Sequence, residues 1–206
     1  MKNFYIILIL FLSFTIYSCA KKSDSSSSSS TTTEGSTTTE LEGTWQTPCH
    51  ARGSKYMIRT LTVSGTNVTD QWKYHFDSSC DNDSYSYDAT FSSLSIGDEY
   101  TDDGYGSSGG SGHQFTMTID TNTYTSLSAS DLTWVNNNSF CGENDWVLNT
   151  AQSIAGKTCD GDDFWNTNIT IYGLYMFDGN KLFHNFTSGS YPSSNNVGDN
   201  DVFTKQ

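Results

Sequence analysis

Residues 168–187, NITIYGLYMFDGNKLFHNFT, decide the fold of this chain. Two runs rich in large apolar residues flank Asp178-Gly179-Asn180, and this arrangement is a strong local signal of a β-hairpin. The same two-residue period recurs upstream, where large apolar side chains alternate with polar ones at 72–76, 85–91 and 115–119. Such alternation is typical of strands with one buried face. The sequence therefore predicts a mostly β protein.

The remaining pattern completes an all-β prediction. Further strands are expected at 43–48, 55–64, 123–128, 132–136, 145–149 and 201–205, with turns at Ser64-Gly65 and Asp103-Gly104. One short helical turn is expected at 150–156, capped by Thr150. Because short turns separate successive strands, we expect an antiparallel up-and-down barrel, which also leaves no strand edge exposed. A β-sandwich of the Ig-like or jelly-roll kind is the alternative.

Both ends of this region resemble lipocalins. The segment Leu41-Glu42-Gly43-Thr44-Trp45 resembles the G-x-W motif on the first strand of lipocalins and of bacterial lipocalin-like lipoproteins. The hairpin FDGNKLF at 177–183 and the terminal VFTK at 202–205 are similar to the last strands of such lipoprotein domains. The resemblance implies a lipocalin-like barrel in which Gly43 and Trp45 form the barrel-end motif and Trp45 plugs the closed end.

Residues 1–18 have the parts of a secretory signal: Lys2 near the start, an apolar run, and Ser18 before Cys19. The run is shorter than the roughly 20 residues that a membrane-spanning helix needs. Its end, Ile16-Tyr17-Ser18-Cys19, resembles a lipobox, in which signal peptidase cuts before a cysteine that already carries diacylglycerol. The resemblance implies a bacterial lipoprotein, held to the membrane by acyl chains such as palmitate on Cys19. Because Ala20 follows, it also implies sorting to the outer membrane. An ordinary secretory signal is the alternative.

The next segment, residues 19–40, contains a Ser/Thr-rich tract with no apolar residue larger than Ala after Cys19. Such a tract behaves as a flexible coil, here about 25 Å from end to end. We therefore expect a disordered linker at 19–40 and one lipocalin-like β domain at 41–206. An O-glycosylated stalk is the alternative for the tract.

The charge balance excludes one class of partner. The chain has 10 Lys and Arg against 23 Asp and Glu, a net charge of -13. Lys2 is the one charged residue in 1–18, so removal of the signal leaves 9 basic residues against 23 acidic ones, or -14. Such a field repels phosphates, so no nucleic-acid partner is expected.

Four cysteines lie in the β domain: Cys49, Cys80, Cys141 and Cys159. An even number in an exported chain predicts two disulfides, for which three pairings are possible. The sequential pairing is favoured, because each pair then flanks a local unit. No CxxC or HxxxH spacing occurs, so no zinc or other metal site is predicted.

Residues that could carry catalysis form no recognisable set. The four histidines, His50, His75, His113 and His184, are widely spaced, and no G-x-S-x-G elbow occurs. Acidic pairs such as Asp160 with Asp162-Asp163 are interpreted as solvated loops, with Ca²⁺ sites as the alternative. The Gly-rich stretch 104–112 is interpreted as a surface loop or a lid. We therefore predict no catalytic residue, no cofactor and no enzymatic activity.

Two functions remain. The first is a module that binds a small apolar ligand in the barrel mouth; the second is a surface interaction or adhesion-type lipoprotein that contacts a protein partner through its loops and has a filled barrel. Side-chain packing separates them, because a filled interior leaves no room for a ligand. The inward positions to inspect are Tyr74, Phe76, Phe115, Met117 and Tyr175.

Overall fold

The computed structural model describes residues 39–102, 110–193 and 201–206, which cover most of the β domain and the last two residues of the predicted linker. Its strands are β1 (Gly43–Gln46), β2 (His50–Arg52), β3 (Lys55–Ser64), β4 (Asn67–His75), β5 (Asp83–Asp102), β6 (Gly110–Ser126), β7 (Gln152–Ser153), β8 (Thr158–Cys159), β9 (Asp162–Asp163), β10 (Thr170–Asp178), β11 (Lys181–Ser188) and β12 (Phe203–Lys205). The helices are α2 (Ala129–Asn137) and the short 3-10 turn η2 (Phe140–Gly142). The predicted signal peptide, Cys19, and the Asp103-Gly104 turn lie outside the described residues.

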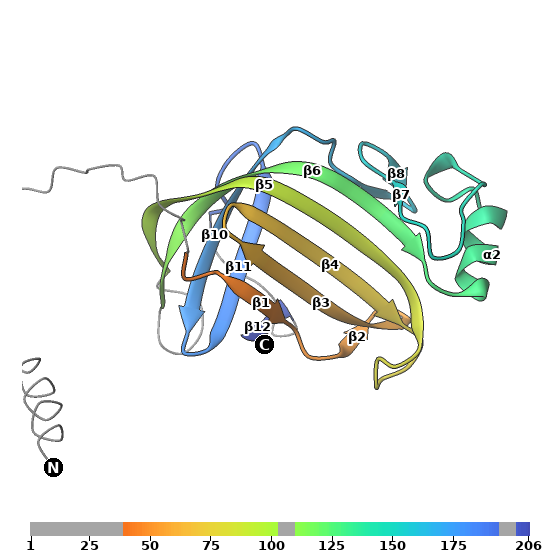
Figure 1. Cartoon of the computed structure of the whole chain (residues 1–206), viewed down its shortest axis with the longest axis horizontal. Coiled ribbons are helices and arrows are strands. Elements are labelled where there is room, and N and C mark those ends of the chain that lie inside the picture. The colour runs from red at the N-terminus through yellow and green to blue at the C-terminus, as the bar shows by residue number, and fades with distance from the viewer. Residues whose placement is uncertain (1–38, 103–109, 194–200) are drawn as a thin grey trace, which may run out of the picture. The chain divides into compact units, whose positions relative to one another are not determined.

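Eight strands close into an antiparallel barrel (Figure 1). Around the barrel they follow chain order, β1, β3, β4, β5, β6, β10, β11 and β12, and β1 pairs with both β12 and β3. Two short strands lie beside this ring, β2 against β3 and β7 against β6. The lipocalin-like up-and-down barrel is therefore confirmed, and the sandwich alternative is wrong.

The hairpin of β10 and β11 forms as predicted. Asp178 pairs with Lys181 across a two-residue turn, in which Gly179 adopts φ 60°, a conformation that favours glycine. Gly173, on β10 itself, makes room for the core: a Cβ at this position would lie 2.1 Å from the ring of Phe115. Packing of an aromatic ring over a strand glycine thus fixes β10 against β6.

One end of the barrel is filled by apolar side chains, and we call it the closed end. On β3 the buried residues alternate strictly, as Met57, Arg59, Leu61 and Val63. Leu61 and Val63 pack with Trp45 in one cluster. The other buried members of this cluster are Leu41, Val68, Phe91, Leu94, Phe115, Met117, Ile119, Ile171, Tyr175, Leu182 and Phe203.

The connection between β6 and β10, residues 127–169, differs from the short turns expected. We call it the insertion; it contains α2, η2 and β7 to β9, and α2 lies beyond one end of β5 and β6 in Figure 1. The strand predicted at 132–136 is wrong, because this stretch is helical. The hydroxyl of Ser128 accepts the N–H of Asp131, which caps α2, and Val135 is completely buried on the helix. The run 132–136 is only five residues long, so its pattern is compatible with a helix as well as with a strand.

Three other predicted elements also differ from the structure. The predicted strand 123–128 is the end of β6 and not a separate strand. Residues 145–149 form no strand, since the backbone N–H of Trp146 donates to Asn136 instead. The helical turn predicted at 150–156 is wrong, because β7 within it pairs with β6 and the N–H of Ile154 donates to Asn122. Pairing with the end of β6 therefore decides the structure of this weakly patterned stretch.

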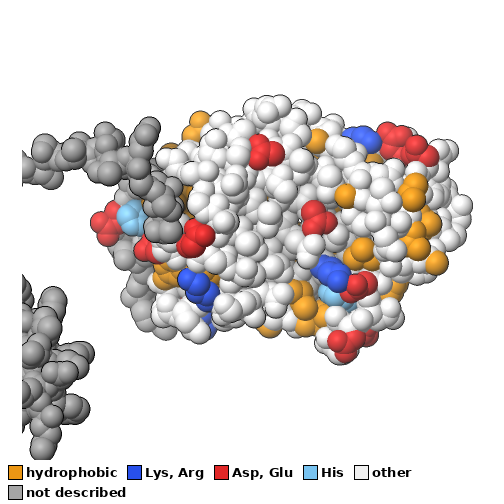
Figure 2. Space-filling view, viewed as in Figure 1, with side chains coloured by type: hydrophobic (Ala, Val, Ile, Leu, Met, Phe, Trp, Pro, Cys, Tyr) orange, Lys and Arg blue, Asp and Glu red, His pale blue; other side chains and the backbone are white. Residues whose placement is uncertain are grey.

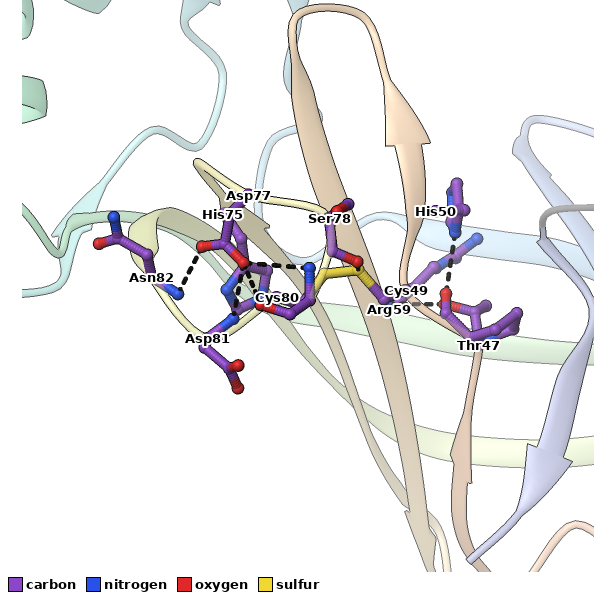
Figure 3. The surroundings of a disulfide bond; sticks show 12 residues. Thr47, Cys49, His50, Arg59, His75, Asp77, Ser78, Cys80, Asp81 and Asn82 are labelled. Atoms are coloured by element: carbon purple, nitrogen blue, oxygen red, sulfur yellow. Dashed lines mark hydrogen bonds between the residues drawn. A yellow bond between two sulfur atoms is a disulfide. The ribbon is translucent and has the colours of Figure 1, made fainter.

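Both disulfides are present in the favoured sequential pairing. Cys49, which follows β1, is bonded to Cys80 in the loop between β4 and β5, and Cys141 is bonded to Cys159. Figure 3 shows the loop around the first bond, where the carboxylate of Asp77 accepts backbone N–H groups. The first disulfide links the segment after β1 to the loop between β4 and β5, whereas the second lies within the insertion.

Candidate functional site

A pocket of about 640 Å³ begins at Phe91 and Ile119 of the Trp45 cluster and extends toward the insertion. We call its insertion side the mouth. Side chains from β3, β4, β5, β6, β11 and the insertion line it, which places the pocket between the barrel wall and the insertion. The lining residues are Arg52, Arg59, Asp70, Trp72, Tyr74, Tyr87, Asp88, Ala89, Phe91, Ile119, Asn122, Asp162, Asp163, Phe164, Trp165, His184, Asn185, Phe186 and Asp201.

A buried ion pair forms part of the lining. Arg59 donates through Nε to Asp70 Oδ1 at 2.9 Å and through Nη2 to Asp70 Oδ2 at 2.6 Å. The indole N–H of Trp72 also donates to Asp70, at 3.2 Å. Burial alone raises the pKa of Asp70, but the charge and hydrogen bonds of Arg59 outweigh it and hold that pKa below its usual value. The Asp70 carboxylate is therefore charged at neutral pH.

Aromatic rings surround the Arg59 guanidinium. Its Cζ lies 4.5 Å from the ring centroid of Trp72, 5.4 Å from that of Phe203 and 5.6 Å from that of Phe186. Cation–π contacts of this kind stabilise a desolvated guanidinium. Arg59 is thus held in place by both its charge partner and the rings.

His184 lies beside this pair and is 5% exposed. Its ring stacks on Phe186 with an interplanar angle of 4° and a centroid distance of 5.4 Å. Burial and then the charge of Arg59 lower the pKa of His184 to about 3, so the ring is neutral. Its Nε2 atom is buried without a hydrogen-bonding partner among residues 39–102, 110–193 and 201–206.

Aromatic contacts hold the insertion against the mouth. Phe164 stacks on Tyr87 of β5 with centroids 5.2 Å apart, and Trp165 packs on Phe186 of β11 at 5.9 Å. Tyr87 in turn contacts Tyr74 and Tyr85 on the barrel wall. The pocket therefore has aromatic walls on both its barrel and its insertion side.

The mouth carries mostly acidic side chains. Asp162 and Asp163 come from the insertion, Asp201 precedes β12, and Arg52 lies on β2. Burial is the main cause of the raised pKa of Tyr74; Arg52 opposes the shift, while Asp162 and Asp201 add to it. The Oδ1 atom of Asp201 is buried and has no partner in the part of the chain that the structure describes. The face visible in Figure 2 also carries carboxylates at several separate places.

The residues of the barrel-end motif lie away from this pocket. Trp45 is 4% exposed, and its indole N–H donates to the Leu41 carbonyl at 2.8 Å. Lys205 Nζ lies 5.2 Å from the Trp45 ring centroid, and a Cβ on Gly43 would lie 3.1 Å from the Lys205 side chain. The motif therefore contributes to packing at the closed end, and it contributes nothing to the pocket lining.

The residues expected to point into the barrel lie in different parts of the structure. Phe115, Met117 and Tyr175 fill the closed end, whereas Tyr74 lines the pocket. Phe76 lies outside the barrel, 37% exposed, under the Lys55 ammonium at 3.6 Å. The barrel is thus filled over part of its depth and hollow at its mouth.

Sequence reasoning missed the polar residues of the pocket. The sequence favours a solvent-side strand position for His184, which is wrong because the side chain is 5% exposed, and it singles out neither Arg59 nor Asp70. A usable signal was present, since each of the three occupies an inward position of an alternating strand where an apolar side chain is expected. On β4, for example, Asp70 lies between the inward positions Val68 and Trp72.

The other predicted candidates form no site. His50, His75 and His113 do not line the pocket, and His75 lies 3.1 Å from the Asp83 carboxylate. No group of three or more His, Cys, Asp or Glu in the described ranges could hold a metal ion. Among the same residues, no helix has both the length and the apolar character to span a membrane.

Comparison with known proteins gives no relative from which to assign this site: no family model and no curated protein matches the chain.

Proposed function

We propose that this chain is a bacterial lipoprotein, lipid-anchored in the cell envelope, whose barrel binds a small organic ligand. The observation that carries the binding part is the pocket of about 640 Å³ with the unpartnered His184 Nε2 in its lining. Ligand sites typically have volumes of about 300–1,000 Å³, with mostly aromatic and apolar walls and a few polar groups that orient the ligand. The pocket has both kinds of group.

The anchor part of the proposal rests on the lipobox-like sequence that ends at Cys19. Two disulfides in the β domain support export, because such bonds persist in oxidising compartments. A flexible linker between Cys19 and the barrel would let the mouth stand clear of the membrane surface. Since Ala20 follows the cysteine, the proposed location is the outer membrane.

Binding of the neutral fluorescent dye N-phenyl-1-naphthylamine tests the ligand proposal. Ala89 lines the pocket, so Ala89→Phe should fill space and weaken dye binding about tenfold or more. Thr69→Phe is the matched control, because Thr69 is exposed on β4 and does not line the pocket. Equal dye binding by the wild type and Ala89→Phe would contradict the proposed site. No dye binding at all would favour the alternative, an interaction protein that binds nothing in its barrel.

Mass spectrometry of the protein purified from bacterial membranes tests the anchor. We expect the mature chain to begin at Cys19 and to carry three acyl chains, which together bind a membrane durably. Cys19→Ala should move the protein from the membrane fraction to the soluble fraction. An unmodified Cys19 in membrane-extracted protein would overturn the proposed anchor.

A further inference from the structure

We propose that the pocket selects small organic cations: the charged amine lies at the mouth beside Asp162 and Asp201, and an apolar body lies along the aromatic lining. This inference rests on the proposed function and names the ligand class of the same site. It follows from where the pocket places its charges and its rings.

The charges of Arg59 and Asp70 cancel. Two direct hydrogen bonds join them, so neither leaves a net charge for a ligand to balance. Asp88 is also engaged, because its carboxylate accepts from Gln71 Nε2 at 2.6 Å and from Ser86 Oγ at 2.6 Å. The residues at the mouth therefore decide which ligand charge the pocket favours.

At the mouth, three carboxylates face one guanidinium. Asp162, Asp163 and Asp201 outnumber Arg52, which leaves an excess of negative charge. Asp163 accepts a hydrogen bond from Thr158, whereas Asp162 and Asp201 line the pocket together with Tyr74. Asp162 is exposed and Asp201 is half-buried at the mouth, so their carboxylates can approach an ammonium group.

The walls suit the body of such a ligand. Phe164 and Trp165 of the insertion pack on Tyr87 and Phe186 of the barrel, and all four rings line the pocket. Aromatic faces attract organic cations through the ring quadrupole, and the attraction is stronger where water is excluded. Aromatic walls with carboxylates at their edge therefore favour an amine over a neutral molecule of the same shape.

The same groups disfavour anions. The guanidinium nearest the buried part of the pocket already binds Asp70, and His184 is neutral, so neither attracts a carboxylate or a phosphate. The net charge of -14 on the chain after residue 18 also repels an approaching anion.

Three indoles that share one body and differ in charge test this inference: tryptamine, the neutral indole-3-ethanol and the anionic indole-3-acetate. Isothermal titration of the mature protein at low salt should give tryptamine an affinity about tenfold or more above that of indole-3-acetate. The difference should fall to about threefold or less in 1 M NaCl, because salt screens the mouth charges. Equal binding of the three indoles, or tighter binding of the anion, would overturn the cation preference.

The double variant Asp162→Asn/Asp201→Asn locates the preference. It should remove most of the advantage of tryptamine and leave the binding of indole-3-ethanol unchanged. Asp145→Asn/Asp178→Asn is the matched control, because both residues are exposed, lie outside the pocket lining and change the net charge equally. If this control lost the preference as fully as the pocket variant, the general charge of the protein and not the mouth would be responsible.

The dye N-phenyl-1-naphthylamine separates failure of this inference from failure of the proposed function. Dye binding together with equal affinity for the three indoles would overturn only the assigned ligand class. If neither the dye nor any indole bound, the proposed binding function itself would fail.

Discussion

The closed end and the mouth of the barrel are built from the same strands but by different rules. At the closed end, inward positions such as Leu61, Val63 and Val68 carry apolar side chains, and the interior is filled. Toward the mouth, inward positions of the same two strands carry Arg59 and Asp70, and the interior contains a pocket. The difference indicates that apolar alternation builds the barrel, whereas charged residues that interrupt it on the inner face mark the candidate site.

The largest expected effect comes from breaking the buried ion pair in the pocket lining. Arg59→Met leaves the buried Asp70 carboxylate without its partner, and such a change typically costs about 3–5 kcal/mol of the free energy of unfolding. Urea denaturation followed by circular dichroism measures the loss. The double variant Arg59→Met/Asp70→Leu should recover most of it, since an apolar pair of similar volume needs no charge partner. A double variant less stable than Arg59→Met would show that the pair does more than balance charge.

The two disulfides allow a second comparison, between the barrel and the insertion. Removal of either bond, as Cys49→Ser/Cys80→Ser or Cys141→Ser/Cys159→Ser, is expected to cost about 3–4 kcal/mol in the chain-entropy model. Removal of the Cys141–Cys159 bond should weaken dye binding more than removal of the Cys49–Cys80 bond. Only the second bond lies in the insertion, which supplies Phe164 and Trp165 to the pocket. Dye titration of the two double variants in dilute urea checks this difference, and an equal loss of affinity in both would contradict it.

A pH titration tests the burial of His184 in the lining of the pocket. Its pKa is lowered from 6.5 to about 3 in the folded protein, so the unfolded chain binds more protons between these values. Stability is therefore lost as the pH falls below 6.5, by about 2 kcal/mol at pH 5. The Arg59–Asp70 pair does not contribute in this range, because the pKa of Asp70 lies below 3.8.

Urea denaturation at pH 7 and pH 5 measures this loss, and His184→Gln should reduce its size. His113→Gln is the control, since His113 is not buried and lies outside the pocket lining. If His184→Gln kept the full loss between the two pH values, another group would have to be its source.

Most of the barrel could be predicted from the sequence, because the two-residue period of residues such as Phe115, Met117 and Ile119 has one simple structural meaning. The insertion could not. Its short runs, for example Leu132 to Val135, fit a helix as well as a strand, and their structure depends on a cap and on contacts with β6. The pocket was missed for a different reason: a histidine at an inward position indicates a ligand site only when its ring nitrogen is known to lack a partner.

The smallest expected effect concerns the cap that turned a predicted strand into α2. The Ser128 hydroxyl accepts the N–H of Asp131, so Ser128→Ala should lower the free energy of unfolding by about 1 kcal/mol. Ser128→Asp should retain the cap, because its carboxylate can accept the same N–H. Since α2 belongs to the insertion, hydrogen exchange should accelerate in residues 129–137 of Ser128→Ala and stay unchanged in β3 and β4. Uniform acceleration across the barrel would mean that the insertion and the closed end unfold as one cooperative unit, and the two regions would then differ in sequence pattern but not in stability.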